Sequence, residues 1–276
     1  MKKISKYLYS CLPLLMVLAV FFLVPNLFAL MQILFPGAFL FRLLGPAGNP
    51  NSPDYLNLIS TIMYACALIP VTCWYFFGIY QKHSSRRRGS FGPSTVGPVV
   101  FLALGVSHSL TLLFMIMSIF IPDALNSYNN LIEDSGMLNY SVLWFISTII
   151  LPPLVEELTF RGITMHLFQK AGAPFWIANI LQALLFGVFH MNLVQGIYAF
   201  FLGILLGYLV KRYNSLIASM TFHAFFNFFG TWLSDLESRY FDDYLNFLAM
   251  IVGIFLSVYA LYRIKKTTRP RSGNWG

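Results

Sequence analysis

Apolar runs of membrane-spanning length recur along the whole of this chain. The first extends from about Tyr7 to Phe35, and a helix needs only about 20 consecutive apolar residues to cross a bilayer. Hydrophobic residues make up 58% of the 276, charged residues make up only 10%, and no long polar segment could form a separate soluble domain. The chain is therefore predicted to be an all-α integral membrane protein that crosses the membrane several times.

The apolar runs predict about eight transmembrane helices in one bundle, separated by polar or Pro- and Gly-rich segments. Residues 1–139 would form an N-terminal three-span region, residues 140–232 a core with the polar motifs, and residues 233–276 the last span with a basic tail. In the sixth helix, Gly203 and Gly207 form a small-xxx-small pair that predicts a close-packing face. The approximate helix ranges are 7–35, 55–80, 98–121, 140–168, 175–190, 193–210, 214–233 and 244–262.

Basic and acidic residues fall on opposite sides of the predicted spans. Fifteen of the 18 Lys and Arg residues lie on the side that holds both termini, and all acidic residues outside the spans lie on the other side. Positively charged loops stay in the cytoplasm, so both termini are predicted to be cytoplasmic, at the plasma membrane if the protein is prokaryotic. The net charge of +8 is confined to short runs at span ends, where orientation explains it better than nucleic acid does. Cys11, Cys66 and Cys73 show no paired spacing in a loop, so no disulfide framework or thiolate zinc site is predicted.

Three charged residues, Glu156, Glu157 and Arg161, interrupt the fourth predicted span. An ionised side chain near the bilayer centre costs about 2.5 to 3.5 kcal/mol, so such residues need partners and usually serve a function. On a helix Glu157 and Arg161 are i and i+4 and can pair, whereas Glu156 points about 100° away. Glu156 is therefore the candidate general base. The alternative is a buried ion cluster that only fixes helix packing.

Two other predicted spans each carry a pair of candidate site residues one helical turn apart. Phe186 and His190 are i and i+4, and so are His223 and Asn227. Each pair alone is a weak signal, because a single His in a helix is more often structural. A carboxylate base, two imidazoles and a carboxamide are together the groups needed to activate water and stabilise an oxyanion in amide hydrolysis. This combination predicts a peptidase.

The candidate site residues are predicted to lie at different depths in the membrane. Counted from the ends of straight helices, Glu156, His190 and His223 would not be level with one another. Helix tilt or a break at Pro152-Pro153 is expected to bring them together.

The ordered set of motifs resembles the CAAX prenyl protease 2 family, also called the CPBP or Abi family of intramembrane proteases. The resemblance covers about residues 140–232, which would be the catalytic core. By that resemblance Glu156 would activate the attacking water with help from His190, and His223 and Asn227 would hold the developing oxyanion. The supporting residues would be Glu157, Arg161 and Phe186. The motifs are EExxxR at 156–161, FxxxH at 186–190 and HxxxN at 223–227.

The resemblance leaves the cofactor open. The family is commonly labelled metalloprotease, and Glu156, His190 and His223 are a possible ligand set for zinc. No His-Glu-x-x-His motif is present on one helix, so a metal-independent, glutamate-based mechanism is favoured.

The substrate and the function class also stay open. The substrate would be a peptide or protein, membrane-associated or lipidated, because eukaryotic relatives are associated with removing the last three residues of prenylated proteins. Prokaryotic relatives are associated with peptide maturation or bacteriocin self-immunity. A non-catalytic membrane scaffold or sensor that regulates a partner is the alternative, against which the intact motifs argue. A transporter is a third reading, and no inverted repeat supports it.

Overall fold

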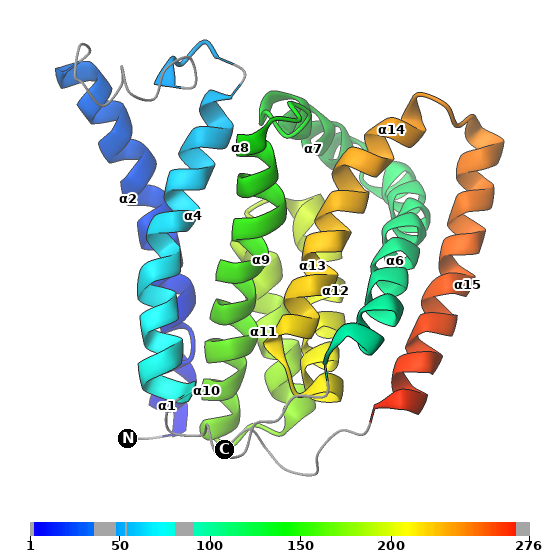
Figure 1. Ribbon diagram of the computed structural model, residues 1–276. Coiled ribbons are helices and arrows are strands. Elements are labelled where there is room, and N and C mark those ends of the chain that lie inside the picture. Colours follow the sequence, from blue (N-terminus) through cyan, green and yellow to red (C-terminus); the bar gives the residue numbers. More distant parts are fainter. Residues whose placement is uncertain (1–2, 36–47, 53, 81–90, 269–276) are drawn as a thin grey trace.

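A computed structural model describes residues 3–35, 48–52, 54–80 and 91–268, and shows a bundle of helices (Figure 1). No strand occurs in these ranges, so the all-α prediction is confirmed. The loop with Arg86, Arg87 and Arg88, the loop with Arg42, and the basic tail beyond Thr268 lie outside the described residues.

The helices follow one another up and down the bundle. The first half of the chain contains α1 (Lys3–Tyr9), α2 (Leu12–Leu34), α4 (Tyr55–Cys73), its π-helical continuation η2 (Trp74–Tyr80), α6 (Pro93–Phe120) and α7 (Pro122–Asp134). One long irregular helix comes next, made of α8 (Val142–Trp144), η4 (Phe145–Ile150), α9 (Leu151–Glu156), η5 (Glu157–Thr164) and α10 (Met165–Lys170). The rest comprises α11 (Phe175–Phe189), α12 (Leu193–Tyr213), α13 (Leu216–Phe228), η6 (Phe229–Leu233), α14 (Ser234–Ser238) and α15 (Asp243–Thr267).

Each of the eight expected transmembrane helices is present as a helix, but eight membrane crossings are not confirmed. The α11 helix has only 15 residues, which is about 22 Å, and the helical stretch from Leu216 to Ser238 contains several polar residues. Six segments in the described ranges are long and apolar enough to cross a membrane, namely Ile4–Leu34, Tyr55–Tyr80, Pro93–Phe120, Val142–Lys170, Leu193–Tyr213 and Asp243–Thr267.

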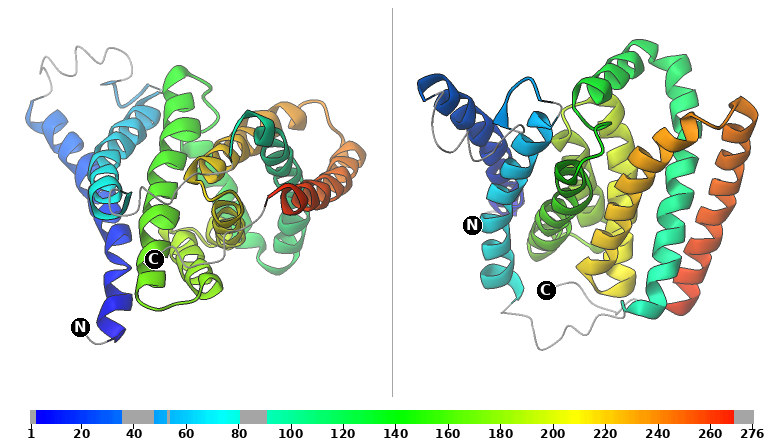
Figure 2. Two further views of the ribbon diagram at one scale, coloured as in Figure 1. Left: turned by 60° about the horizontal axis from the view of Figure 1, so that its bottom comes forward. Right: turned by 45° about the horizontal axis from the view of Figure 1, so that its top comes forward.

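The helix Val142–Lys170 is the centre of the bundle. Of the 18 residues in its apolar stretch, 61% are buried inside the protein, whereas the corresponding share is 17% for Ile4–Leu34 and for Asp243–Thr267. Its neighbours include α4 and α13 (Figure 1). At the two edges α2 lies beside α4 and α15 lies beside α6 (Figure 2). The polar motif at 156–161 therefore sits in the most enclosed helix.

A helix also forms where the sequence was interpreted as a loop. The segment Pro122–Asp134 is α7, with Pro122 at its start, Asp123 in its first turn and no buried residue. Figure 1 shows it at the end of the bundle opposite α1. It contacts α12 through the hydroxyl groups of Tyr128 and Tyr198, which are 3.2 Å apart.

The α11 and α12 helices pack closely because glycines face polar side chains. The Asn179 carboxamide occupies the space where a Cβ on Gly207 would lie, and donates to the Ile204 carbonyl at 3.0 Å. Gln182 donates to Asn179 at 2.8 Å and to the Gly203 carbonyl at 2.9 Å. The close-packing face expected at Gly203 and Gly207 is confirmed. It holds α11 rigidly on α12, and α11 carries Phe186 at its far end.

Candidate functional site

The central helix is irregular on both sides of the Glu-Glu motif. It is π-helical at Phe145–Ile150 and again at Glu157–Thr164, with α9 between. Such π-helical turns are rare and occur frequently at functional sites. No break occurs at Pro152-Pro153: the helix continues through both prolines, which lie in α9 directly after the first π-helical stretch.

Asn227 compensates for the missing N–H groups of these prolines. The Thr148 carbonyl would accept from residue 152 in an α-helix and from residue 153 in a π-helix, and both are proline. A carbonyl left unpaired in a membrane costs several kcal/mol. Asn227 Nδ2 donates to this carbonyl at 2.9 Å, which fixes α13 against the central helix and leaves one N–H of the carboxamide for another partner.

Glu157 binds neighbours on its own helix and on α13 through one carboxylate oxygen, and its buried Oε2 has no hydrogen-bond partner among the described residues. Its Oε1 accepts from Arg161 Nη1 at 2.8 Å and from His223 Nδ1 at 2.9 Å, and the Glu157 and Arg161 side chains have no exposed surface. The predicted i,i+4 pair is present. Because an ionised carboxylate can only accept, Nδ1 of His223 carries a proton, so the neutral imidazole presents Nε2 as an acceptor.

Glu156 is bound on one side only. Its Oε1 accepts from the Tyr64 hydroxyl at 2.7 Å. Its buried Oε2 has no hydrogen-bond partner among the described residues, and His223 Nε2 lies 3.7 Å from it. His223 thus faces both glutamates, one through each ring nitrogen. Both glutamates keep an unbonded Oε2 among the described residues, and they differ in the partner of Oε1, which is a guanidinium for Glu157 and a neutral hydroxyl for Glu156.

Phe186 connects the charged pair with both histidines. The Arg161 guanidinium lies 4.3 Å from the centre of its ring, a cation–π contact. The ring centre is 5.0 Å from that of His190 and 6.0 Å from that of His223. The first position of the FxxxH motif therefore holds the guanidinium and two imidazoles in place.

His190 lies where α11 ends, and its contacts are aromatic. Its ring lies tilted or edge-on to those of Phe186 and Phe189, and no hydrogen bond to the ring occurs within the described part of the chain. His223, not His190, is the imidazole found close to Glu156. The structure thus brings Glu156, Glu157, Arg161, Phe186, His190 and His223 together around one point, while Asn227 lies one turn beyond His223 and bonds to Thr148.

Tyr64 is the residue of this site that sequence reasoning missed. It lies on α4, 92 positions before Glu156, in a span that has other polar side chains such as Tyr55, Asn57 and Thr61, so nothing in the sequence marks it out. Phe21 of α2 packs edge-on against its ring, with centroids 4.8 Å apart. The N-terminal region therefore contributes to the site, although no motif there points to it.

The possible zinc ligands do not form a compact set. A structural or catalytic zinc needs at least three protein ligands at about 2.0 to 2.3 Å. In the described ranges no three His, Cys, Asp or Glu side chains are grouped so that they could hold one ion. His223 Nδ1 donates to Glu157 Oε1, which leaves Nε2 as the ring nitrogen that could bind a metal.

Comparison with known proteins places the motifs in a described family. Residues 138–229, about a third of the chain, match the family described as Rce1-like, Type II CAAX prenyl endopeptidase Rce1-like. This match confirms the resemblance that the three motifs predict, and it covers nearly the same residues. No curated protein and no solved structure matches the chain.

Proposed function

We propose that this protein is a CAAX-protease-like intramembrane endopeptidase, which hydrolyses a peptide bond of a lipidated substrate close to the membrane surface. The family description supports the reaction class. The observation that carries the proposal is the difference between the two glutamates. Oε2 of both glutamates is buried without a hydrogen-bond partner among the described residues. Oε1 of Glu157, however, is paired with the Arg161 guanidinium, whereas Glu156 has no cationic partner of this kind and its Oε2 lies 3.7 Å from His223 Nε2.

A water molecule between Glu156 and His223 would donate a hydrogen bond to each of them. Oε2 of Glu156 and Nε2 of His223 are both acceptors and are 3.7 Å apart, so they do not bond directly to each other. One water can donate to both and turn a lone pair towards a peptide carbonyl. The proposed nucleophile is this water, and Glu156 is the base that takes its proton.

The proton then has a complete route. As the water oxygen bonds to the carbonyl carbon, one water proton passes to Glu156 Oε2. When the C–N bond breaks, the same proton passes from Glu156 to the departing amine nitrogen, which gives a carboxylic acid and an amine. Tyr64 holds Oε1 of Glu156 at 2.7 Å and so directs Oε2 towards the reacting groups.

The oxyanion is assigned to the remaining N–H groups. Asn227 uses one N–H on Thr148 and has a second, and the neutral imidazole of His190 has one ring N–H that can donate to the oxyanion. The N–H of His223 is bonded to Glu157, so His223 would act on the water and not on the oxyanion. Each of these steps uses the substrate, one water molecule and side chains of this protein. The mechanism is therefore proposed to be metal-independent.

The test is cleavage of a fluorescent peptide that ends in a farnesylated Cys and three further residues. Glu156→Gln should lower kcat by about 10²-fold or more, because the amide cannot take the proton. Its melting temperature should stay close to that of the unmodified protein, since Gln can still accept from Tyr64. An active Glu156→Gln variant would remove the proposed base, and absence of cleavage by the unmodified protein would favour the non-catalytic scaffold.

The same assay tests metal independence. Activity should persist after incubation with EDTA. Loss of activity on chelation and its recovery on adding zinc would contradict the metal-free mechanism, while leaving the peptidase assignment in place.

A further inference from the structure

A groove between α11, α12 and α15 is open on the outer surface of the bundle, away from the candidate active site. Its volume is about 490 Å³, and its walls include Trp176 of α11, Phe201, Ile204 and Tyr208 of α12, and Tyr262 and Lys265 of α15. Trp176, Phe201 and Tyr262 are each more than half exposed. In a membrane, this exposed surface would be in contact with lipid.

The groove exists because α12 and α15 pack on different partners. The α12 helix packs on α11, and α15 packs on α6. The two helices are joined at their ends by Arg212, whose Nε donates to Thr268 Oγ1 at 2.9 Å and whose Nη2 donates to the carbonyls of Lys265 and Thr268. The Arg212 bonds therefore lie beside Lys265, at the polar end of the groove.

Cations and amphipathic aromatic rings gather at this end. Lys265 is one of the lining residues. The Lys211 ammonium lies 4.0 Å from the centre of the Phe175 ring and 5.7 Å from that of Trp176. Trp176 and Tyr208 stack at 6.5 Å with an interplanar angle of 14°. Trp and Tyr are enriched at the membrane–water interface, so this end belongs at the level of the lipid headgroups.

We propose that the groove binds one anionic phospholipid, with an acyl chain between α12 and α15 and the headgroup phosphate beside Lys211 and Lys265. The apolar walls suit the chain, and the two ammonium groups match the charge of the headgroup. Basic pockets between helices on the cytoplasmic side are a known setting for anionic lipids. Arg212 is occupied by the end of α15, so the two lysines supply the charge.

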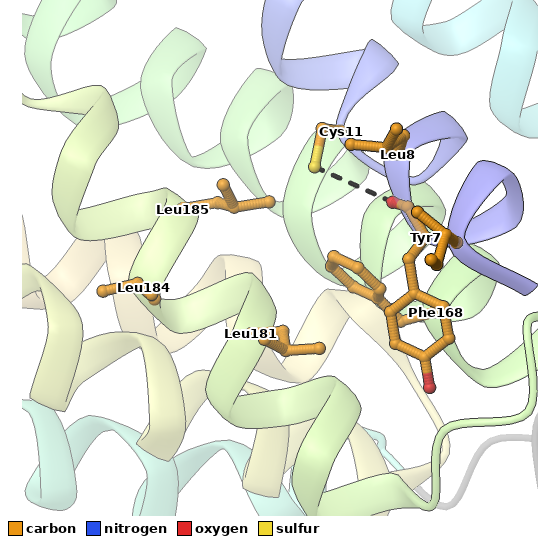
Figure 3. Close-up of a pocket in the computed structure, with 8 residues that line it drawn as sticks. Tyr7, Leu8, Cys11, Phe168, Leu181, Leu184 and Leu185 are labelled. Atoms are coloured by element: carbon orange, nitrogen blue, oxygen red, sulfur yellow. Dashed lines mark hydrogen bonds between the residues drawn. The ribbon is translucent and has the colours of Figure 1, made fainter.

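A second surface groove serves as an internal comparison. It has a volume of about 420 Å³ and is lined by Ile4, Tyr7, Leu8, Cys11, Phe168, Leu181, Leu184 and Leu185 (Figure 3). The Cys11 thiol within it donates to the Tyr7 carbonyl of the same helix turn. No charged side chain lines this groove, so it offers apolar contact without selectivity for a headgroup.

The experiment measures lipid retention by native mass spectrometry. The full chain is purified from nanodiscs that contain equal amounts of phosphatidylglycerol and phosphatidylcholine. One phosphatidylglycerol should be retained in preference to phosphatidylcholine. The double variant Lys211→Gln/Lys265→Gln should retain about tenfold less phosphatidylglycerol than the unmodified protein. Equal retention of the two lipids by the unmodified protein would overturn the proposal.

Two controls separate a specific site from general attraction. Arg263→Gln removes the same charge from α15 two residues before Lys265, about 200° around the helix, and should leave retention unchanged. An equal loss in this variant would mean diffuse attraction and overturn the site. Ile204→Trp should fill the groove and lower phosphatidylglycerol retention with both lysines intact, whereas Leu184→Trp in the other groove should not. Unchanged retention in a folded Ile204→Trp variant would show that the lipid lies elsewhere.

Discussion

Glu156 and Glu157 are adjacent in the chain, yet the groups around their carboxylates differ. Oε1 of Glu157 accepts from a guanidinium and an imidazole, and Oε1 of Glu156 accepts from a neutral tyrosine, while Oε2 of each is unbonded among the described residues. This difference follows from the roughly 100° between consecutive helical residues, which directs one side chain along the helix to Arg161 and the other towards α4. In the proposed mechanism Glu157 would hold the site together and Glu156 would take the proton from the water.

Glu157→Gln should destabilise the protein as well as inactivate it. The change leaves the buried Arg161 charge without its 2.8 Å partner, and breaking a buried pair typically costs about 3 to 5 kcal/mol. Purified yield, melting temperature and peptide cleavage should fall together. Glu157→Asp, which keeps the charge, should restore part of the stability. A Glu157→Gln protein that melts normally but is inactive would instead assign the base to Glu157.

Tyr64→Phe should lower kcat with little change in KM. The variant removes the hydroxyl that donates to Glu156 at 2.7 Å. A hydrogen bond to a charged group contributes about 1.5 to 3 kcal/mol, which corresponds to roughly 10- to 100-fold in rate. In a Glu156→Gln background the same change should have almost no further effect, because both act through one carboxylate.

The matched control for this variant is Tyr55→Phe on the same helix, which removes a hydroxyl that donates to Gln32 at 2.7 Å. It is expected to leave kcat unchanged. Equal losses in the two variants would mean that Tyr64 only supports the fold of α4.

The limits of sequence prediction at this scale follow from distance along the chain. The Glu157–Arg161 pair could be predicted because its spacing is local. Tyr64 could not, because its partner is 92 residues away and is brought near only when α4 packs against the central helix. The same holds for Asn227, whose bond to Thr148 spans 79 residues and adds a packing function to the predicted oxyanion role.

At the scale of elements, hydropathy located the helices but not their irregularities. The range 55–80 was predicted and Tyr55–Tyr80 is observed, and the last helix differs from its predicted range by only a few residues. The α7 helix was missed because its residues are polar, although Pro122 and Asp123 are typical of a helix start. The π-helical turns could not be predicted, since they depend on a carbonyl satisfied from another helix.

Gly207→Ala should destabilise the contact between α11 and α12. The new Cβ would lie 1.8 Å from Asn179 Oδ1, so the carboxamide must move and its bonds to Ile204 and Gln182 are strained or lost. Overpacking of this kind typically costs about 1 to 3 kcal/mol, which detergent melting curves can measure. Asn179→Ala in the same protein should remove the overlap, so the double variant should be more stable than the sum of the two single effects implies.

The control is Gly97→Ala in α6, where a Cβ meets nothing within 4 Å. Alanine is preferred to glycine in a helix, so stability should stay the same or rise by up to about 1 kcal/mol. A Gly207→Ala protein that melts like this control would show that α11 and α12 are not held in close contact.

For the whole molecule, charge is divided between the two ends of the bundle. The end where α1 begins and α15 ends carries exposed Lys170 and Lys266 and the Arg212 link (Figure 1). The opposite end carries the acidic residues of α7 and α14, including Asp123 and Glu237. With the orientation predicted from the sequence, the lysines of the lipid groove would lie in the leaflet that holds more anionic lipid.

The orientation can be tested with single cysteines in a variant without Cys11, Cys66 and Cys73. Positive charge is retained in the cytoplasm, so Lys170→Cys should be cytoplasmic and Ser238→Cys should lie on the opposite side, each at an exposed position. In intact cells an impermeant maleimide should label Ser238→Cys, and should label Lys170→Cys only after permeabilisation. Because the two positions lie at opposite ends of one bundle, the reverse pattern would invert the whole protein in the membrane. It would also move the groove lysines to the outer leaflet, whereas labelling of both positions in intact cells would mean that the chain inserts in two orientations.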